Sequence, residues 1–414
     1  MTPRFLTLAL AGTLLAPAAR LDAQASRAPA LSPPRTTRDS LLHTLQGILD
    51  KGVADSAFPG AIAVVGNRRG RMLTVAAGHL DWAPSPVPDE HTLWDLASLT
   101  KVIGLTSAME QLVEAKKVDL DAPVQRYLPD WTGPHKELVT VRHLLTHTGG
   151  LPPDQPRGSK SYDAITHDPD SVAKLMFWTP LDTLPGVRMV YGDIGAYVLG
   201  RIVEQVTGQS LDVYLHDHVF EPLGMHETTY RPPYALRSRI APTERDTVQR
   251  LRLVRGMVHD ERAYYIGGVS GHAGLFSSAF DLERLARAYL LGGQLDGARL
   301  AQAGTIRLFT TVVDSTFSSR ALGWDTPKDS WFGHFVKRPA FGHTGFTGTS
   351  IIISPPLDLY IVLLTNRVNP TRDHSRITPV RVAVSDAVMR AFFPDVVRAL
   401  ETQAASTTSQ PGRP

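Results

Sequence analysis

The chain has 414 residues, of which 43% are hydrophobic and 20% charged, as is typical of a globular protein with a large core. The formal net charge is +3 without a clustered run of lysine and arginine, which argues against a nucleic-acid partner. The absence of cysteine excludes disulfides, a thiol nucleophile, thiolate metal sites and a cysteine-linked lipid anchor.

The first 25 residues have the pattern of a secretory signal peptide. Arg4 gives a short positive start, residues 5–16 form an apolar run, and residues 23–25 (Ala-Gln-Ala) fit a small-x-small cleavage site. The apolar run is too short to span a bilayer in the mature chain, and no other stretch qualifies. We therefore expect a periplasmic or secreted protein, cleaved after about Ala25, with a flexible linker over 26–38.

An amphipathic helix is predicted over residues 40–51. Two strands, 61–65 and 72–76, follow it and pair across a glycine-containing turn. From about residue 120 to residue 300 the pattern is mostly helical, with long loops rich in glycine and proline.

Strand patterns return near the end of the chain. Residues 331–336, 349–354 and 359–365 are short apolar runs bounded by glycine, proline or aspartate. Residues 378–393 predict a final helix with proline in its first turn. A disordered polar tail is expected over 398–414.

Strands at both ends with helices between them predict an α/β fold of the α+β type. An antiparallel sheet is built from both chain ends, is flanked by helices and packs against a mostly helical insertion domain. We expect one domain over 39–397, in which about 39–115 and 315–397 form the α/β part and about 116–314 the helical part.

Ser98-Leu-Thr-Lys101 places a hydroxyl and an amine on one face of a helix, because residues three apart on a helix are neighbours. A serine hydroxyl is a poor nucleophile until a nearby base takes its proton. A lysine can be that base only if burial or another cation lowers its pKa. The flanking residues 94–97 and 102–105 are mainly apolar, which predicts a buried helix start beneath a cleft.

The same S-x-x-K spacing occurs at Ser171 and Lys174. Residues 168–170 (Asp-Pro-Asp) precede this copy and are typical of a helix N-terminus. We therefore interpret Ser171 as structural and Lys174 as a solvated side chain of the first turn.

Two further tripeptides carry polar groups at turns or strand ends. Tyr191-Gly192-Asp193 could present a phenol to a cleft as a proton shuttle, or it could be a half-buried tyrosine satisfied by backbone. His343-Thr344-Gly345 is expected at the start of a strand, where small residues let a substrate backbone approach the edge. An ordinary turn before an edge strand would also explain it.

Together, these three signals resemble the serine β-lactamase and penicillin-binding-protein superfamily, most closely its class C-like branch. The resemblance covers roughly residues 40–393 and includes S-x-x-K, Y-x-[ND] and [KH]-T-G in that order. It implies a β-lactamase/transpeptidase-like fold. Four further strings resemble a periplasmic penicillin-binding, esterase-like subgroup: residues 143–151, 222–225, 256–261 and 267–277.

The resemblance implies a role for each motif residue. Ser98 would attack a carbonyl and become acylated, while Lys101 and Tyr191 share the proton transfers, with the base in each step left open. Backbone N–H groups of Ser98 and Phe346 would bind the oxyanion. Thr344, with Gly345 beside it, would contact the substrate along the strand edge.

Three positions depart from the best-known members or could compensate for a departure. His343 replaces a lysine and is only partly charged near neutral pH, so we expect weaker binding of a substrate carboxylate and inefficient β-lactam hydrolysis. Asp193 replaces an asparagine and could pair with Lys101. Arg372 lies in a segment similar to a carboxylate-binding segment of class C enzymes and could supply the missing positive charge.

The remaining histidines have open or structural interpretations. His143 and His147 lie four apart on a predicted helix, but no H-E-x-x-H pattern is present, so packing or capping is favoured over metal binding. His272 lies in a glycine-rich loop that should form one wall of the cleft, where it could contact substrate or stabilise the loop. No cofactor or metal is expected.

The favoured hypothesis is an exported serine hydrolase that forms an acyl-enzyme on small amides or esters. Candidate substrates are peptidoglycan-type D-amino-acid peptides, short-chain esters and β-lactams. An α/β-hydrolase would need G-x-S-x-G, which neither Ser98 nor Ser270 fits. The alternative is a penicillin-binding sensor module that acylates without turnover.

Overall fold

The computed structural model describes residues 31–153 and 168–408, except 314, 317, 329 and 338. The expected signal peptide lies outside the described residues. Within them, no helix combines the length and apolar character needed to cross a bilayer.

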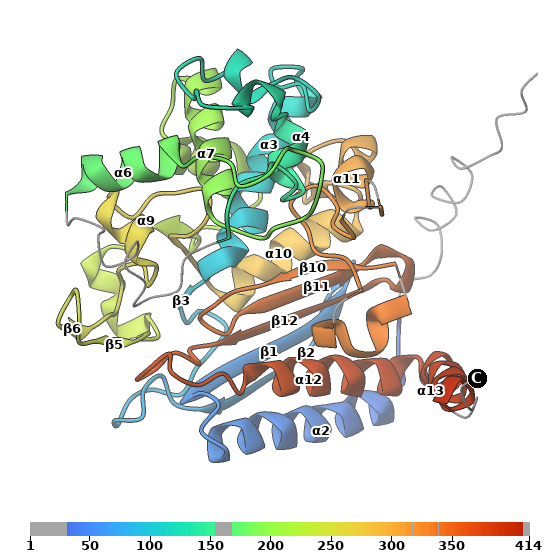
Figure 1. Cartoon of the computed structure of the whole chain (residues 1–414). Helices are drawn as coiled ribbons and strands as arrows, with labels where there is room; N and C mark the ends of the chain where they lie inside the picture. Colours follow the sequence, from blue (N-terminus) through green and yellow to red (C-terminus); the bar gives the residue numbers. More distant parts are fainter. Residues whose placement is uncertain are drawn as a thin grey trace, which may run out of the picture.

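A five-stranded antiparallel sheet forms the centre of the α/β part, with the strand order β10-β11-β12-β1-β2 (Figure 1). The first and last strands of the chain are neighbours, with Ala61 opposite Thr365 and Val64 opposite Val362. Both chain ends therefore build one sheet, as predicted. Its strands are β1 (Gly60–Asn67), β2 (Gly70–Gly78), β10 (Phe341–Thr344), β11 (Ser350–Ser354) and β12 (Leu359–Thr365).

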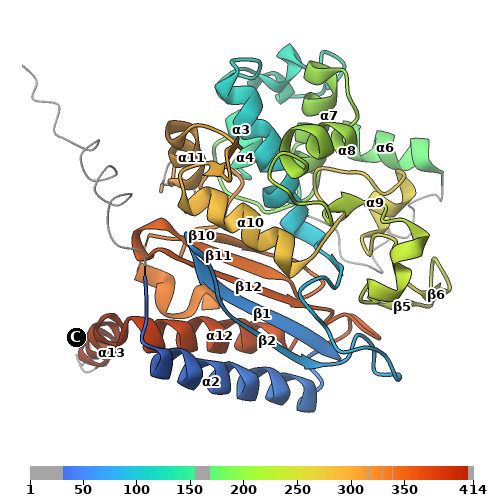
Figure 2. The same ribbon diagram turned by 180° about the vertical axis from the view of Figure 1, so that it is seen from behind.

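Helices cover both faces of this sheet. Helices α2 (Arg35–Ala54) and α12 (Ile377–Phe392) lie on one face, and α10 (Ala279–Leu290) lies on the other (Figures 1 and 2). The central strands β1, β11 and β12 are buried along their whole length, which explains their continuous apolar runs. Two large apolar clusters fill the spaces on either side of the sheet.

The middle of the chain forms the mostly helical part that packs over α10 (Figure 2). Its helices are α3 (Ser107–Glu114), α4 (Val141–Leu145), α6 (Pro169–Trp178), α7 (Ile194–Thr207), α8 (Leu211–Leu215), α9 (Glu261–Tyr265) and α11 (Ala303–Thr310). Short 3₁₀ or π segments are η1 (Ala97–Leu99), η2 (Lys101–Thr106), η3 (Val124–Arg126), η4 (Lys136–Leu138), η5 (His216–Phe220) and η6 (Tyr234–Arg239).

Short strands also pair outside the main sheet. A small sheet has the order β3-β7-β4, with β3 (Trp94–Asp95), β7 (Leu275–Ser277) and β4 (Thr229–Tyr230). Two hairpins pair β5 (Arg245–Asp246) with β6 (Arg252–Leu253) and β8 (Gln294–Leu295) with β9 (Ala298–Arg299).

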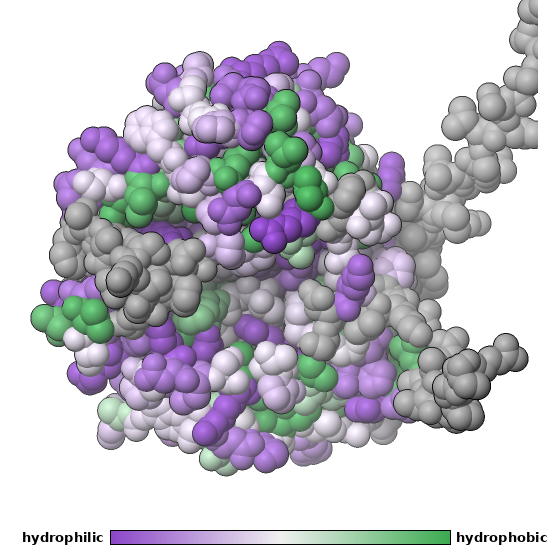
Figure 3. All heavy atoms as spheres, viewed as in Figure 1, coloured by the Kyte–Doolittle hydropathy of each residue, from purple (hydrophilic) through white to green (hydrophobic). Residues whose placement is uncertain are grey.

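The face of the molecule seen in Figure 3 is mainly hydrophilic and carries scattered small patches of hydrophobic residues.

The structure corrects the prediction of a strand over 331–336. This segment is the 3₁₀ element η7 (Ser330–Lys337), bent at Gly333, which has a φ of 56°. Its buried aromatics Trp331, Phe332 and Phe335 belong to the apolar cluster shared with α12, and Ser385 Oγ donates to the Phe332 carbonyl at 2.8 Å. An aromatic-rich run fits a buried helical turn as well as a strand.

The two expected irregular ends also differ from the prediction. Helix α2 begins at Arg35, inside the expected linker. Helix α13 (Pro394–Thr408) occupies most of the expected disordered tail. A short 3₁₀ helix, η8 (Pro355–Leu357), joins β11 to β12. The strands predicted over 61–65, 72–76, 349–354 and 359–365 correspond to β1, β2, β11 and β12.

Candidate active site

A sharp turn between β3 and η2 carries Ser98. The two side-chain oxygens of buried Asp95 accept the N–H groups of Ala97 at 2.9 Å and His259 at 2.6 Å. Ala97 has a φ of 46°, a left-handed conformation that costs a non-glycine residue about 1 kcal/mol or more. The chain therefore holds Ser98 on a strained, hydrogen-bonded turn.

Lys101 lies directly behind the Ser98 hydroxyl. Its Nζ is 3.0 Å from Ser98 Oγ and 2.6 Å from Asp193 Oδ1, and its side chain is only 3% exposed. Burial raises the pKa of Asp193, but Lys101 and then His272 outweigh it and hold that pKa below its usual value. The structure thus forms the Lys101–Asp193 pair that the sequence suggested.

The sequence allowed two roles for His272, substrate contact or stabilisation of its loop, and the structure supports the second. Its ring is fully buried, with Nε2 3.0 Å from Asp260 Oδ1 and Nδ1 2.6 Å from Ser270 Oγ. Its carbonyl oxygen accepts from Lys101 Nζ at 3.2 Å. Because both ring nitrogens are engaged, the proposed substrate contact of His272 is corrected to support of the loop beside Lys101.

Three of these groups also satisfy the spacing of a metal site, since ligand atoms of Asp193, Asp260 and His272 lie within 4.8 Å of one another. The Lys101 side chain already places a positive charge beside Asp193. Asp260 in turn contacts the His272 ring, so each of the two carboxylates has a partner among the described residues.

Tyr191 lies at the meeting point of four chain segments. Its ring centroid is 5.2 Å from Lys101 Nζ, 5.9 Å from the His343 ring, 4.6 Å from the His147 ring and 5.4 Å from the Arg320 guanidinium. The side chain is 36% exposed, so it borders open space. The structure therefore brings Ser98, Lys101, Tyr191 and His343 together.

His343 lies near the end of strand β10, not at the start of a strand as the sequence suggested. Its Nδ1 is 2.8 Å from the Thr344 carbonyl oxygen, which can only accept, so Nδ1 carries the proton. Its Nε2 is buried and has no hydrogen-bond partner among the described residues.

The expected partial charge on His343 is also corrected. Burial, followed by Arg320 and Lys101, lowers the pKa of His343 well below the usual value. The imidazole is therefore neutral near pH 7, and its unpaired Nε2 is an acceptor and not a donor.

The loop after β10 packs directly against the nucleophile turn. Thr347 Oγ1 donates to the Asp95 carbonyl at 2.7 Å, and Thr349 Oγ1 donates to the Leu96 carbonyl at 3.0 Å. A Cβ at Gly345 would collide with the Leu96 carbonyl oxygen and the Thr349 hydroxyl. Glycine is therefore required by close approach of the two segments.

The free edge of this region faces the expected substrate position. Strand β10 is the edge strand of the main sheet, and Thr344 is its last residue. Among the described residues, the Phe346 N–H donates to no backbone carbonyl. The Phe346 ring is 48% exposed and lies 4.2 Å from the Arg367 guanidinium.

Arg372 does not supply a free positive charge. Its Nε is 2.7 Å from Glu244 Oε2, and its Nη2 is 2.6 Å from Glu261 Oε1. Two carboxylates therefore neutralise this guanidinium. Its predicted role in binding a substrate carboxylate is corrected to an ion pair beneath Phe346.

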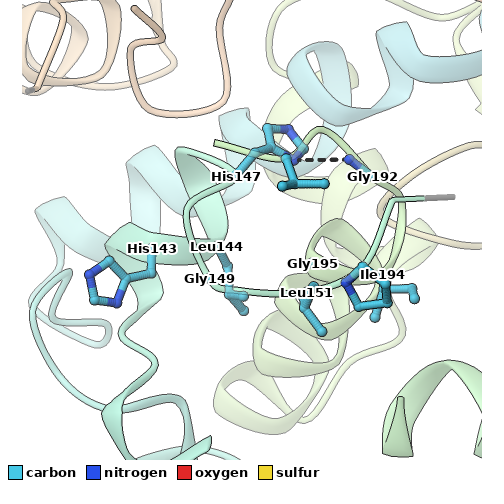
Figure 4. Close-up of a pocket in the computed structure, with 10 residues that line it drawn as sticks. His143, Leu144, His147, Gly149, Leu151, Gly192, Ile194 and Gly195 are labelled. Carbon is cyan, nitrogen blue, oxygen red and sulfur yellow. Dashed lines mark hydrogen bonds between the residues drawn. The ribbon is translucent and has the colours of Figure 1, made fainter. Parts of the chain in front are cut away.

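His143 and His147 do not share a helix, because α4 ends at Leu145 and His147 follows with a φ of 57°. His143 Nδ1 accepts the Thr140 N–H at 3.2 Å and caps the helix, while His147 Nδ1 accepts the Gly192 N–H at 3.5 Å. Figure 4 shows the two rings at separate ends of a pocket beside the Tyr191 loop. Capping and packing therefore explain both histidines.

Sequence reasoning missed several residues that shape this site. Asp95 and Asp260 stand beside or within the quoted motifs, so their position was a usable signal. Arg320 has no motif around it, although it pairs with Asp325 and faces Tyr191. Asp325 in turn forms a backbone bridge to Gly342 of β10.

A family model described as Beta-lactamase matches residues 45–385. A protein of Escherichia coli (strain K12) named putative D-alanyl-D-alanine carboxypeptidase is 35% identical over 303 residues, which cover 67% of this chain and 69% of that protein. An N-acetylmuramyl-L-alanine amidase of Bacillus subtilis (strain 168) is 34% identical over 364 residues, which cover 79% of this chain and 81% of the amidase.

The solved structure of a penicillin-binding protein homologue from Caulobacter crescentus has a TM-score of 0.67 to this chain at 21% identity. The match covers 85% of this chain and 97% of the homologue. It confirms the expected β-lactamase/transpeptidase-like fold.

Proposed function

The chain belongs to the β-lactamase family and is a serine hydrolase, and we propose that it works through an acyl-enzyme formed on Ser98. The observation that carries this proposal is the contact of 3.0 Å between Lys101 Nζ and Ser98 Oγ, in a buried position held by Asp193. In the second S-x-x-K copy, neither Ser171 nor Lys174 pairs with a carboxylate from a remote segment among the described residues, and the Ser171 N–H donates to Asp168 three positions away.

The pairing of Lys101 favours a division of the proton transfers. A carboxylate at 2.6 Å stabilises the ammonium form of Lys101, which has no lone pair and donates to Ser98 Oγ. We therefore assign acceptance of the Ser98 proton in the first step to the phenolic oxygen of Tyr191, whose ring lies beside Lys101 and Arg320.

The bonds change in two steps. Ser98 Oγ attacks the substrate carbonyl carbon while its proton passes to Tyr191, and the N–H groups of Ser98 and Phe346 stabilise the oxyanion. The bond to the leaving nitrogen or oxygen then breaks as Tyr191 returns the proton to it. Water attacks the resulting ester of Ser98 with the same groups, releasing the acid and restoring the hydroxyl.

We propose peptidoglycan-type peptides containing D-amino acids as the first substrate class, with short-chain esters as surrogates. The names of the two relatives, a carboxypeptidase and an amidase, support cleavage of amide bonds of this kind. Neutral His343 and the doubly paired Arg372 leave neither of the two expected positions with a free positive charge for a β-lactam carboxylate. Such substrates would be met outside the cytoplasm, in agreement with the signal peptide expected at residues 1–25.

The direct test is mass spectrometry of the protein after exposure to labelled penicillin and a panel of D-alanyl esters and peptides. We expect a covalent adduct on the peptide containing Ser98, together with turnover of at least one ester or peptide. An adduct on another residue, or full turnover by Ser98→Ala, would contradict the proposal.

Burst kinetics with p-nitrophenyl acetate distinguish the hydrolase from a sensor module. We expect a burst followed by a steady phase. A stoichiometric burst without turnover on any ester or peptide would support the sensor and reject the hydrolase.

A further inference from the structure

Two buried arginines lie behind the loop that carries Phe346. Arg381 on α12 is 9% exposed, and Arg367, which follows β12, is 5% exposed. Neither makes an ion pair with a carboxylate among the residues that the structure describes. Burying a cation without a counter-charge costs folding free energy, so other interactions must offset that cost.

Each guanidinium donates to backbone carbonyls around Phe346, although Arg367 Nη1 donates to the His374 carbonyl at 3.0 Å and Arg381 Nε has no hydrogen-bond partner among the described residues. Arg381 Nη2 is 2.9 Å from the Gly345 oxygen and 2.9 Å from the Thr349 oxygen. Arg367 Nε is 2.7 Å from the Phe346 oxygen. The Gly345 oxygen also accepts the Gly348 N–H at 3.0 Å, so two donors converge on this one carbonyl.

The Gly345 carbonyl and the Phe346 N–H belong to the same peptide group. A positive charge on the carbonyl oxygen withdraws electron density through the planar amide and makes the N–H a stronger donor. An oxyanion forming at that N–H would therefore be stabilised by the guanidinium without touching it.

We propose that Arg381 is a positioning residue for the oxyanion hole, polarising and orienting the Gly345–Phe346 peptide from behind. The inference rests on the proposed acyl-enzyme function of Ser98. It goes beyond that function by assigning part of the transition-state stabilisation to a residue that lies outside the cleft.

Arg381 and Arg367 differ from the other cations of the site because they lack a carboxylate partner among the described residues, and of these two only Arg381 contacts the Gly345 carbonyl. Lys101 pairs with Asp193, Arg372 with Glu244 and Glu261, and Arg320 with Asp325. The charge of Arg381 has no such partner among the described residues. Burial, and then the nearby Arg367, lower its pKa, in agreement with an uncompensated charge.

The test compares three substitutions of Arg381 with p-nitrophenyl acetate as substrate. Arg381→Met removes the charge and the donors, Arg381→Gln keeps a donor without the charge, and Arg381→Lys keeps the charge. We expect Met and Gln to lower kcat about tenfold to a hundredfold with KM changed less than about threefold, and Lys to recover most of kcat. Affinity for phenylboronic acid, which forms a tetrahedral adduct with the serine, should fall by a similar factor.

Arg284 provides a matched control. It also donates from Nε to a backbone carbonyl, that of Leu223, and it pairs with Asp296 away from the cleft. Arg284→Met should lower the thermal unfolding midpoint without changing kcat or boronate affinity. If Arg381→Met does not fold, the Gln variant carries the comparison.

Two results would overturn the inference. One is a wild-type kcat in folded Arg381→Gln, and the other is an equal loss in the Lys and Gln variants. Ser98→Ala, measured in parallel, separates this failure from that of the proposed function. If Ser98→Ala is inactive while Arg381→Gln is unimpaired, only the role of Arg381 is rejected, whereas an active Ser98→Ala rejects the acyl-enzyme itself.

Discussion

The chain contains two S-x-x-K sequences in opposite surroundings. At Ser98 the lysine is buried, contacts the hydroxyl and is held by a carboxylate from the start of α7. At Ser171 both the serine and Lys174 are exposed in the first turns of α6, and the Ser171 N–H donates to Asp168 at 2.8 Å. One copy belongs to the proposed active site, and the other is part of a helix cap.

The difference teaches that the four-residue pattern supplies only proximity. What distinguishes the Ser98 copy comes from remote segments, namely Asp193, the His272 carbonyl and the loop after β10. In the α6 copy, the Ser171 N–H donates its hydrogen bond to Asp168, only three positions away. Chemistry therefore depends on tertiary contacts that a local motif does not encode.

The largest expected effect comes from removing each serine in turn. Ser98→Ala should lower kcat for p-nitrophenyl acetate on the order of 10⁴-fold or more, because the nucleophile is lost. Ser171→Ala should leave kcat unchanged. Steady-state kinetics measure both variants. Equal effects of the two substitutions would contradict the different roles assigned to the two S-x-x-K copies.

The next effect concerns the carboxylate that only the Ser98 copy has. Asp193→Asn removes the negative charge 2.6 Å from Lys101 and should lower kcat about a hundredfold. Asp170→Asn, in the first turn of α6, is the matched control and should retain full activity. An unchanged rate in Asp193→Asn would show that the ion pair is only structural.

A smaller effect should appear in the pH dependence of stability. His343 stays neutral in the folded chain because its pKa is well below the usual value, while in the unfolded chain it takes a proton as the pH falls below about 6.5. The unfolded state then binds more protons, so stability falls as the pH falls through this value.

Urea unfolding at about pH 7.5 and about pH 5.5 measures this dependence. The loss for His343 alone should be about 1.4 kcal/mol, and His343→Gln should remove that share. Lys174→Gln on exposed α6 should leave the dependence as it is. An unaltered dependence in His343→Gln would contradict a neutral buried imidazole.

The smallest effect belongs to the helix-cap copy. Asp168→Ala removes the acceptor of the Ser171 N–H and should destabilise α6 by about 1 kcal/mol, without changing kcat. Hydrogen exchange of the α6 amides measures the local change. A loss of activity in this variant would connect α6 to the cleft.

The sequence predicted much of the fold because the main sheet is buried on both faces. Burial leaves unbroken apolar runs in β1, β11 and β12, which are strong strand signals. The prediction of a strand over 331–336 was wrong because aromatic side chains can be buried equally well on a helical turn. Its structure depends on packing with α12, which local sequence does not contain.

The sequence predicted the motif residues that line the proposed site. It did not predict the residues whose roles depend on their contacts with other side chains. Ser98, Lys101, Tyr191 and His343 come together as expected. Arg372 and His272 were assigned to substrate, but their partners, Glu244 and Asp260, are fixed only by the tertiary fold. In the sequence nothing distinguishes Arg381 from other arginines on helices. Its contact with the Gly345 carbonyl is visible only in the structure.

Gly345 gives the two halves of the cleft a fixed separation. Its hydrogen atom is all that fits between the strand-end loop and the carbonyl of Leu96, so any methyl group there would act as a wedge. A wedge would shift the Phe346 amide away from the serine while leaving every motif residue in place. Loss of catalysis with an intact set of reactive side chains is therefore the expected outcome of Gly345→Ala.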